Sequence, residues 1–393
     1  MTYLDNAATS FPKPPEVHDR ASAFIQSLGA NPGRGGHRLA AGASRMVDDT
    51  RLALARAINA GATPERVVFA HNGTDAHNMA TTGVLAGRRR PGAPAVAHVI
   101  TSVLEHNSVS RPLEQLAADG AITLTRVRSS ADGFVAPGDV AAAFTRDTRL
   151  VALTHASNVL GSVQPIAAVG AVVRERGDGR AHFLVDAAQT IGVEPIDVEA
   201  AHIDLLAFPG HKALLGYPGT GGLYVAPRVE LAPWREGGTG GDSKHQVQPA
   251  EFPHRLEGGT HNTVGIASLG AGLAFIAATG REVIRAHEAT LAARLLDGLA
   301  QIAGVTVHGP GVTQARVATV AFSVAGYASQ DVGAILDTSF DIAVRPGLHC
   351  APYCHQQVGT YPDGAVRASC GYSTTPADVD ALLEAVSQIA AAA

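Results

Sequence analysis

Short apolar runs alternate with longer amphipathic segments through the first 230 residues of the chain. The runs are rich in Val, Leu, Ile and Phe, which is typical of buried strands, and the segments between them have helical spacing. Strands that alternate with helices predict a mostly parallel sheet with helices on both faces. The predicted strands are 67–70, 96–100, 149–154, 183–186, 203–208 and 221–226.

The pattern changes after residue 227. Residues 234–260 are rich in Gly, His and Pro and lack periodicity, which indicates a long functional loop. A long helical region over 264–303 follows, and then short strands alternate with helices to the end of the chain. We therefore predict a large domain over residues 15–262 and a smaller C-terminal α/β domain over residues 263–393, joined by residues 1–14. The later predicted strands are 305–307, 318–323, 342–344 and 365–369.

Composition narrows the class of protein. Hydrophobic residues make up 46% of the 393 residues and charged residues 17%, as in ordinary globular proteins. The net charge of −5 gives no basic footprint for nucleic acid. The start of the chain lacks a secretory pattern, and the longest apolar stretch, 263–279, is short for a membrane span, so we expect a cytoplasmic protein. Three cysteines form neither a disulfide framework nor a zinc site, and we expect no metal.

Lysine is rare in this chain. Of 30 basic residues only Lys13, Lys212 and Lys244 are lysines, which leaves 27 arginines. Lys212 comes just after the apolar run 203–208, in a loop flanked by Gly and Pro. Arginine cannot replace an amine that must lose its proton and form an imine. Lys212 is therefore a candidate for covalent carbonyl chemistry, with an ordinary exposed loop lysine as the alternative.

Polar residues follow other predicted strands, at the edge where parallel sheets bind ligands. Asp186 ends the strand over 183–186, where its carboxylate could face a cationic ring nitrogen or merely cap a helix. Gln189 lies three residues later, on the same side if the turn is helical. A helix start offers N–H groups and a hydroxyl to a phosphate, unless it is an ordinary capping turn; its residues are Gly73, Thr74 and Asp75.

Five further side chains complete the candidate set. His106 could stack on a flat ring or serve only the structure, and Asn158 could donate to a ring oxygen or a carboxylate. Arg345 and Arg367 flank Cys350, and guanidinium groups suit an amino-acid carboxylate. Cys350 is then a reactive thiol or a buried structural cysteine. A phosphate turn, a stacking histidine, an acid and a lysine occur in the order that a pyridoxal phosphate site uses.

Ten motifs together resemble the class V aminotransferase-fold enzymes, and among them the group II cysteine desulfurase and selenocysteine lyase-like family. The resemblance covers essentially the full length. It implies a fold type I enzyme dependent on pyridoxal 5'-phosphate, with a mixed, mostly parallel seven-stranded sheet, and a homodimer with shared active sites. The motifs are Y-L-D-N-A-A-T (3–9), N-P-G-R-G-G-H (31–37), N-G-T-D-A-H-N (72–78), E-H-N (105–107), S-N-V-L-G (157–161), V-D-A-A-Q (185–189), P-G-H-K (209–212), G-G-T-H-N (258–262), R-P-G-L-H-C-A-P (345–352) and V-R-A-S (366–369).

The resemblance also assigns roles to residues. It implies that Lys212 holds the cofactor covalently, Asp186 pairs with its ring nitrogen, Gln189 bonds its ring hydroxyl and His106 stacks on the ring. It places the substrate carboxylate on Arg367 and Asn158 with Arg345 nearby, and makes Cys350 the nucleophile. It assigns binding of the cofactor phosphate to the turn that contains Thr74, to His211 and to Thr260 of the partner subunit.

These roles predict a cysteine desulfurase, which converts L-cysteine to L-alanine and leaves sulfur on Cys350 as a persulfide. Alternatives are a selenocysteine lyase, a C–S lyase acting on a cysteine derivative, and a catalytically idle scaffold. A separate protein could accept the sulfur. The chain departs from the family pattern at Leu348, where a histidine is usual, and at Pro209, where a serine is common. The role of Cys354 is open, and we expect His349 to help ionise the Cys350 thiol.

Overall fold

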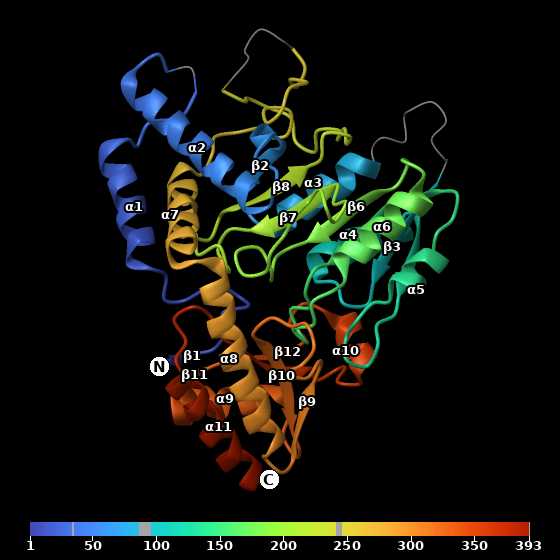
Figure 1. Cartoon of the computed structure of the whole chain (residues 1–393), viewed down its shortest axis with the longest axis vertical. Coiled ribbons are helices and arrows are strands. Elements are labelled where there is room, and N and C mark those ends of the chain that lie inside the picture. The colour runs from blue at the N-terminus through green and yellow to red at the C-terminus, as the bar shows by residue number, and fades with distance from the viewer. Residues whose placement is uncertain (34, 86–95, 241–245, 393) are drawn as a thin grey trace.

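The computed structural model describes every residue except 34, 86–95, 241–245 and 393. Two sheets organise these residues, one in the upper and one in the lower part of the molecule (Figure 1). A third sheet consists of only two short strands, β1 (Thr2–Tyr3) and β11 (Ile342–Ala343), which pair in parallel. This pairing attaches the N-terminal segment to the lower part of the molecule.

The large sheet has seven strands in the order β2-β8-β7-β6-β5-β3-β4. Only β8 runs against its neighbours, so the predicted mixed, mostly parallel sheet is confirmed. The sequence pattern missed β4, an edge strand whose middle residues are not buried. The strands are β2 (Val67–Ala70), β3 (Ala97–Ser102), β4 (Ile122–Val127), β5 (Thr148–Thr154), β6 (His182–Asp186), β7 (Leu205–Pro209) and β8 (Gly221–Val225).

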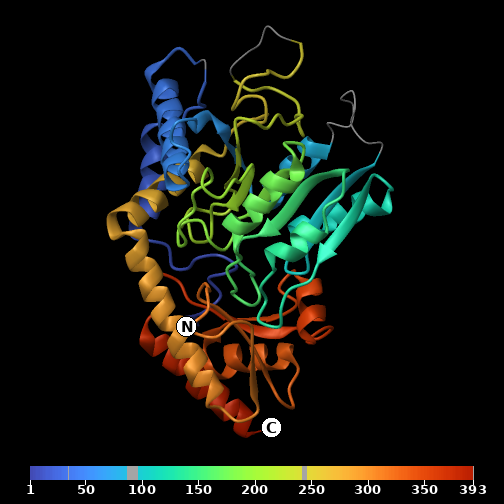
Figure 2. The same cartoon turned by 45° about the vertical axis from the view of Figure 1, so that its right-hand side comes forward.

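Helices cover the large sheet. α3 packs on the central strands, and α4 packs on α3 and on the edge strand β4. α6 packs on β5 and β6, and α5 packs on α6. α1 and α2 pack on α7 at one end of the sheet (Figures 1 and 2). The helices are α1 (Pro15–Ser27), α2 (Arg38–Ala57), α3 (Gly73–Leu85), α4 (Asn107–Ala118), α5 (Pro137–Ala142), α6 (Ile166–Gly177) and α7 (Thr263–Thr279), with a 3₁₀ turn, η1 (Pro64–Arg66).

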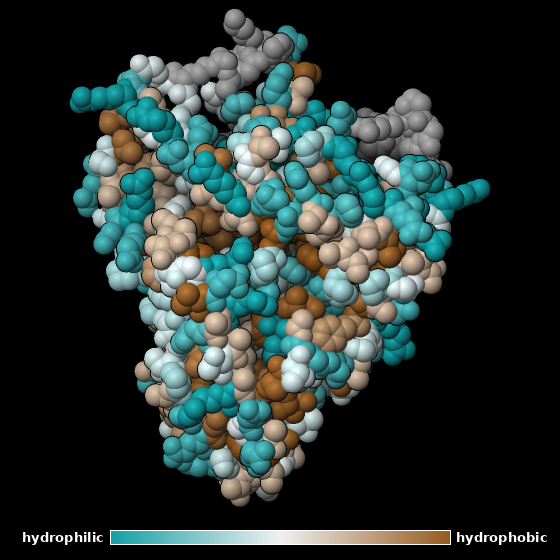
Figure 3. Space-filling view, in the orientation of Figure 1, coloured by the Kyte–Doolittle hydropathy of each residue, from teal (hydrophilic) through white to brown (hydrophobic). Residues whose placement is uncertain are grey.

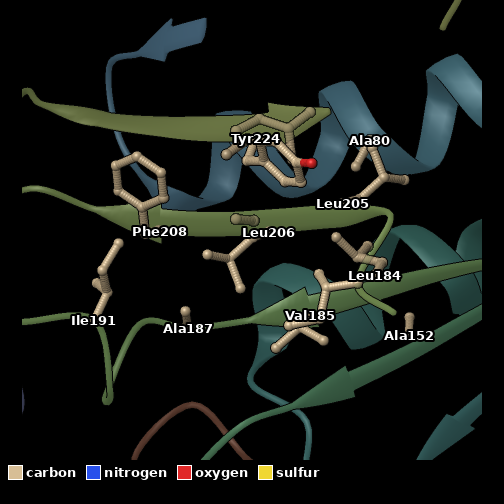
Figure 4. Close-up of a cluster of buried hydrophobic side chains, with 14 of the residues drawn as sticks. Ala80, Ala152, Leu184, Val185, Ala187, Ile191, Leu205, Leu206, Phe208 and Tyr224 are labelled. Carbon is tan, nitrogen blue, oxygen red and sulfur yellow. The ribbon is translucent and has the colours of Figure 1, made fainter. Parts of the chain in front are cut away.

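The core of the large sheet explains why its strands are continuous apolar runs. Leu184 and Val185 of β6 lie beside Leu205 and Leu206 of β7, and Ala80 of α3 packs over them (Figure 4). All five are essentially fully buried. A sheet covered on both faces needs apolar side chains at every position. Each such Leu or Val contributes roughly 1.5–3 kcal/mol, so the ends of β6 and β7 are firmly placed.

The small sheet is antiparallel, in the order β12-β13-β10-β9. Its core is a second apolar cluster to which Phe322, Val366, Leu295 and Leu382 belong. The strands are β9 (Val305–His308), β10 (Thr319–Val324), β12 (Arg345–Gly347) and β13 (Ala365–Ser369), and the helices in this part are α8 (Arg281–Ala300), α9 (Ser329–Phe340), α10 (Pro352–Val358) and α11 (Pro376–Ala391).

The helical region predicted over 264–303 is in fact two helices. α7 ends at Gly280, whose φ of 90° lies in the left-handed region that glycine tolerates, and α8 leaves at an angle of 83°. α7 adds buried residues to the large-sheet core. α8 adds Ile284 to the same core and its later buried apolar residues to the small-sheet core. The domain boundary placed between residues 262 and 263 stays a prediction. Among the described residues, no single helix is long and apolar enough to cross a bilayer, and α7 and α8 satisfy that criterion only as a bent pair.

Candidate active site

Lys212 lies in a tight loop directly after β7. Gly210 N–H donates to Thr220 O (2.8 Å), and Leu215 N–H donates to Lys212 O (2.8 Å). The side chain lines a pocket between the two parts of the molecule, together with Gln189 and Cys370. Figure 3 shows this face hollowed across its middle, where apolar residues lie between polar rims. The rare lysine is therefore part of an interior site, not of an exposed loop.

The electrostatic surroundings of Lys212 suit a nucleophilic amine. Burial lowers the pKa of Lys212 to about 8, although the neighbouring Asp186 carboxylate opposes the shift. Arg367 and Arg345 lower this pKa further, because positive neighbours disfavour a second cation. A lysine with this pKa is unprotonated in a useful fraction of molecules near neutral pH.

Asp186 ends β6, the strand next to β7, and its carboxylate is buried. Burial alone would raise its pKa, but His77 and the Ala188 N–H outweigh burial and hold the pKa at about 2. Ala188 N–H donates to Oδ1 (2.8 Å), and His77 Nε2 lies 3.5 Å from the same oxygen. Within the described residues no donor is assigned to Oδ2. An ionised carboxylate with a free oxygen fits the protonated ring nitrogen of pyridoxal phosphate.

His77 is a site residue that the sequence pattern missed. It is 2% exposed, and neither ring nitrogen has a regular hydrogen-bond partner among the described residues. It lies one turn along α3 from the predicted phosphate turn, so one helix serves both ends of the candidate cofactor site. A buried histidine on a helical apolar face normally indicates core packing, and the sequence contains no local sign of its contact with Asp186.

His106 and Glu105 precede α4. His106 is the N-cap of this helix, and its Nδ1 accepts from Ser108 N–H (3.0 Å), which fixes the ring. Burial lowers the pKa of His106 to about 4, so the ring is neutral and suits stacking on a flat cofactor. Glu105 was not predicted. Its pKa is raised to about 8 by burial, and its Oε1 accepts from Ser102 Oγ (2.6 Å).

The predicted phosphate turn begins α3. Asp75 N–H donates to Asn72 Oδ1 (2.8 Å), whereas the first N–H groups of a helix, here those of Gly73 and Thr74, have no intrahelical acceptor. Gly73 lies against Pro209 at the end of β7, where a Cβ on Gly73 would be 3.5 Å from Pro209 Cδ. The turn and the lysine loop are therefore neighbours, as a cofactor with a ring and a phosphate requires.

The other predicted cofactor residues fall in two places. Gln189 lines the pocket of Lys212, with its Nε2 donating to Ala7 O (3.1 Å). The backbone oxygen of His211 accepts from Thr9 Oγ1 (3.0 Å), and burial lowers the pKa of its ring to about 4. Thr260 is exposed and lines a different pocket, which it shares with Asp75. Its predicted role toward a second subunit stays a prediction.

The two candidate arginines are cross-strand partners on β12 and β13. Arg367 is 1% exposed, and its guanidinium donates to Asp5 Oδ1 (2.6 Å) and to Asn158 O (2.9 Å). Asp5 was not predicted, because 362 positions separate it from Arg367. Arg345 has no carboxylate partner among the described residues, and its Nη2 donates to Cys350 Sγ (3.6 Å).

Cys350 belongs to the cysteine loop, which we define as residues 347–351. His349 and Cys350 have φ values of 49° and 58°, and two consecutive left-handed residues other than glycine cost roughly 2–4 kcal/mol. Two donors hold the loop carbonyls: Asn158 Nδ2 donates to His349 O (2.7 Å), and Asn107 N–H donates to Cys350 O (2.7 Å). Asn158 thus supports the loop with one of its two Nδ2 hydrogens, and its predicted role toward a substrate carboxylate stays a prediction.

His349 does not serve the sulfur as we expected. Its Nε2 is 2.8 Å from Arg345 O and its Nδ1 is 3.1 Å from His355 Nε2, so both nitrogens are occupied. Arg345 is the cation at the sulfur. Cys354 and Cys370 are buried, and burial raises the pKa of both thiols to about 12, which makes them poor nucleophiles. All three cysteines are free, and the described residues contain no group of three or more metal-ligating side chains.

Comparison with known proteins gives a consistent result. The aminotransferase class-V family matches residues 2–382. A cysteine desulfurase of Salmonella gallinarum is 34% identical over 394 residues, which covers 99% of this chain and 93% of the relative, and that of Salmonella typhi shows the same identity and coverage.

Solved structures agree with these relatives. The apo cysteine desulfurase from Thermococcus onnurineus NA1 superposes with a TM-score of 0.91 at 30% identity, and the match covers 100% of this chain and 95% of that one. The cysteine desulfurase CsdA from Escherichia coli, in its S-sulfonic acid form, superposes with a TM-score of 0.86 at 27% identity, with coverage of 98% and 94%.

Proposed function

The chain belongs to the aminotransferase class-V family, and on that basis we propose that it is a pyridoxal 5'-phosphate-dependent cysteine desulfurase. It converts L-cysteine to L-alanine and takes up the sulfur on Cys350 as a persulfide. One observation carries the proposal: the groups that act electrostatically on the pKa of the Lys212 amine include both Asp186 and Cys350. A cofactor-anchoring lysine, a ring-nitrogen acid and a thiol are thus in one site.

The residues fit the cofactor by their chemistry. Lys212 supplies the amine, Asp186 the anion for the ring nitrogen, His106 a neutral ring, Gln189 an amide, and the start of α3 the N–H groups for a phosphate. The bound cofactor acts as an electron sink for negative charge at the α-carbon of the substrate. His211 lies next to Lys212 and is a further candidate for the phosphate.

Lys212 and the two arginines act on the substrate. With a pKa of about 8, the free Lys212 amine can take the proton from the α-carbon of cysteine and later return a proton to the product. Both arginines are candidates to bind the substrate carboxylate: Arg367 as first predicted, since its buried Nε has no partner among the described residues, and Arg345, which has no carboxylate partner there. Asp5 holds another nitrogen of Arg367.

Cys350 takes the sulfur. Its thiolate attacks the sulfur of the substrate, a sulfur–sulfur bond forms, and the bond between the substrate's β-carbon and sulfur breaks. The electron pair of that bond stays on the β-carbon, which gains a proton and becomes the methyl group of alanine. The Arg345 guanidinium donates to Sγ (3.6 Å), and the thiolate form of a cysteine is the nucleophile in such a step.

Product analysis tests this function. We expect the holoenzyme to give alanine and protein-bound sulfur in equal amounts from L-cysteine in the first turnover. Cys350→Ser should still bind cysteine but release sulfide at least a hundredfold more slowly, because a covalent step is lost. Full-rate sulfide release by Cys350→Ser contradicts the proposal. Selenocysteine and cystine offered in parallel decide between a desulfurase and a lyase.

We also propose a homodimer in which Thr260 of the partner subunit completes the phosphate site. The exposure of Thr260, and its place in a pocket apart from Lys212, support this arrangement. Mixing Lys212→Ala with Thr260→Ala protein should then restore activity above that of either variant, because a mixed dimer contains one intact site. Activity that stays at the sum of the two variants contradicts shared sites.

A further inference from the structure

The ring of His349 is one end of a chain of hydrogen bonds that runs away from the pocket. His349 Nε2 lies 2.8 Å from Arg345 O, and His349 Nδ1 lies 3.1 Å from His355 Nε2. His355 Nδ1 lies 2.7 Å from Thr360 Oγ1. Both histidines are almost completely buried. The chain joins β12, the cysteine loop, α10 and the turn that follows α10.

The chemical groups at the two ends of this series of hydrogen bonds decide which atom donates and which accepts in each of them. A backbone carbonyl can only accept, so His349 must carry its proton on Nε2 and accept at Nδ1. His355 must then donate from Nε2 and accept at Nδ1 from the Thr360 hydroxyl. The scheme requires two neutral rings, and burial provides them, since it lowers the pKa of His349 to about 2 and that of His355 to about 4.

His355 itself is rigidly placed. Its backbone oxygen accepts from Thr360 N–H (2.9 Å) and from Tyr361 N–H (3.2 Å) at the end of α10. Its imidazole is therefore a fixed donor, whereas the cysteine loop has a strained left-handed backbone at two consecutive residues. A fixed donor on one side and Arg345 O on the other leave the His349 ring a single position.

We propose that His355 is a positioning residue for Cys350: with Thr360 behind it, it holds the His349 ring on Arg345 O and thereby keeps Cys350 Sγ against the Arg345 guanidinium. The inference rests on the proposed function, in which Cys350 takes up sulfur. His355 touches neither the sulfur nor the cofactor residues described above, and its effect passes through His349 and the loop backbone.

Alkylation of Cys350 in the holoenzyme without substrate tests the inference independently of turnover. Cys354 and Cys370 are buried, so peptide mapping after iodoacetamide treatment reports on Cys350. The variants are His355→Leu, which removes the donor, and His355→Gln, whose amide nitrogen can replace Nε2. Thr360→Val keeps the shape of Thr360 and removes only its hydroxyl.

A matched control is available in β3. His98 is also a buried imidazole held by threonine hydroxyls, Thr148 and Thr125, at 2.8 Å on each nitrogen. It lies in the large sheet, away from the cysteine loop. His98→Leu therefore measures the cost of losing a buried, hydrogen-bonded histidine as such, and the alkylation rate of this variant should match that of the wild type.

In His355→Leu we expect the alkylation rate at pH 7.5 and kcat for cysteine to fall about tenfold, because the contact of the Arg345 guanidinium with Sγ is lost. KM should change less than twofold. In His355→Gln both rates should recover to within about threefold of the wild-type values. The rates of Thr360→Val should lie between those of His355→Leu and His355→Gln. An alkylation rate in folded His355→Leu that is unchanged or higher overturns the inference. If Cys350→Ser remains fully active, the desulfurase proposal fails. The alkylation rates of the His355 variants still test the role of His355 in that case.

Discussion

The lysine side of the site and the cysteine loop are placed by different means. Asp186 ends β6, and Lys212 follows the adjacent strand β7. The apolar core around these two buried strands fixes the position of both residues. Cys350 has no such support. Its position depends on a few hydrogen bonds: Asn107 and Asn158 donate to carbonyls of a left-handed backbone, and the ring of His349 bonds to the ring of His355.

The difference has a functional meaning. Many weak apolar contacts hold a strand end, so the loss of one contact shifts it little. A loop held by single hydrogen bonds responds to each of them, and it can also move when its bonds are exchanged. A cofactor has to stay in place, whereas a cysteine that takes up sulfur has to transfer this sulfur to an acceptor. We therefore expect variants on the two sides to fail in different ways.

The largest effect should come from the lysine side. On the proposed function, Lys212→Ala removes both the cofactor anchor and the base. We therefore expect activity to fall at least about a thousandfold and the visible absorbance of a lysine-bound cofactor to disappear. Lys13 is a matched control, because burial lowers its pKa to about 8 as well, but its Nζ bonds Ser10 and His211 O. Lys13→Met should keep the absorbance. Retention of the band in Lys212→Ala would show that another residue anchors the cofactor.

A smaller effect should follow from His77, which supports the lysine side through Asp186. In His77→Leu the pKa of Asp186 should rise, since the imidazole that opposes the effect of burial is lost. A weaker anion holds the ring-nitrogen proton less firmly, and kcat should fall about tenfold. The measurement is the pH dependence of the cofactor absorbance, which should change in His77→Leu and return in His77→Gln. An unchanged pH profile would make His77 a packing residue.

The smallest effect should be a pH dependence of stability that originates in the cysteine loop. The folded pKa values of His349 and His355, about 2 and 4, lie below the ordinary value of 6.5, so the unfolded chain binds more protons below pH 6.5. Their contribution is complete above pH 6.5. That of His355 is lost as the pH falls toward 4, and that of His349 as the pH falls toward 2. Arg345, Arg367 and His308 are the charged or titratable groups that face the pair.

Urea unfolding at pH 7 and pH 5 measures this contribution. Relative to the wild type, His355→Gln should lose about 2 kcal/mol less stability between these two pH values, because one titrating ring is gone. His106, His155 and His211, whose pKa values are lowered to about 4 by burial, titrate in both proteins and cancel in the difference. An equal pH dependence of the free energy of unfolding in both proteins would show that protonation of His355 does not contribute to the loss of stability in acid.

The sequence predicted the lysine side well for a physical reason. In a parallel sheet covered on both faces, strands are apolar throughout, and polar residues just beyond them must lie at one edge. Asp186, His106 and Lys212 are all such residues. The missed strand β4 is an edge strand with a half-exposed pattern, which resembles a loop in a single sequence.

What the sequence did not predict depends on contacts between distant segments. His77 looks like a core residue of α3 until β6 brings Asp186 beside it. Asp5 and Arg367 are 362 positions apart, and no local pattern links them. The left-handed backbone at His349 and Cys350 could not be predicted, because neither residue is a glycine. Hydrogen bonds, and not the residue type, impose this conformation.

The contact between the N-terminal segment and β13 also bears on how the enzyme is made. Asp5 pairs with Arg367, and Ala7 N–H donates to Ser369 Oγ, while Ala7 O accepts from Gln189 in the lysine pocket. At about 5–20 residues per second, a ribosome needs roughly 20–70 seconds to progress from the first of these residues to the last. The large sheet can form during that interval, but its pocket lacks one wall. We expect ribosome-bound chains that stop before β13 to retain no cofactor, so that loading follows synthesis.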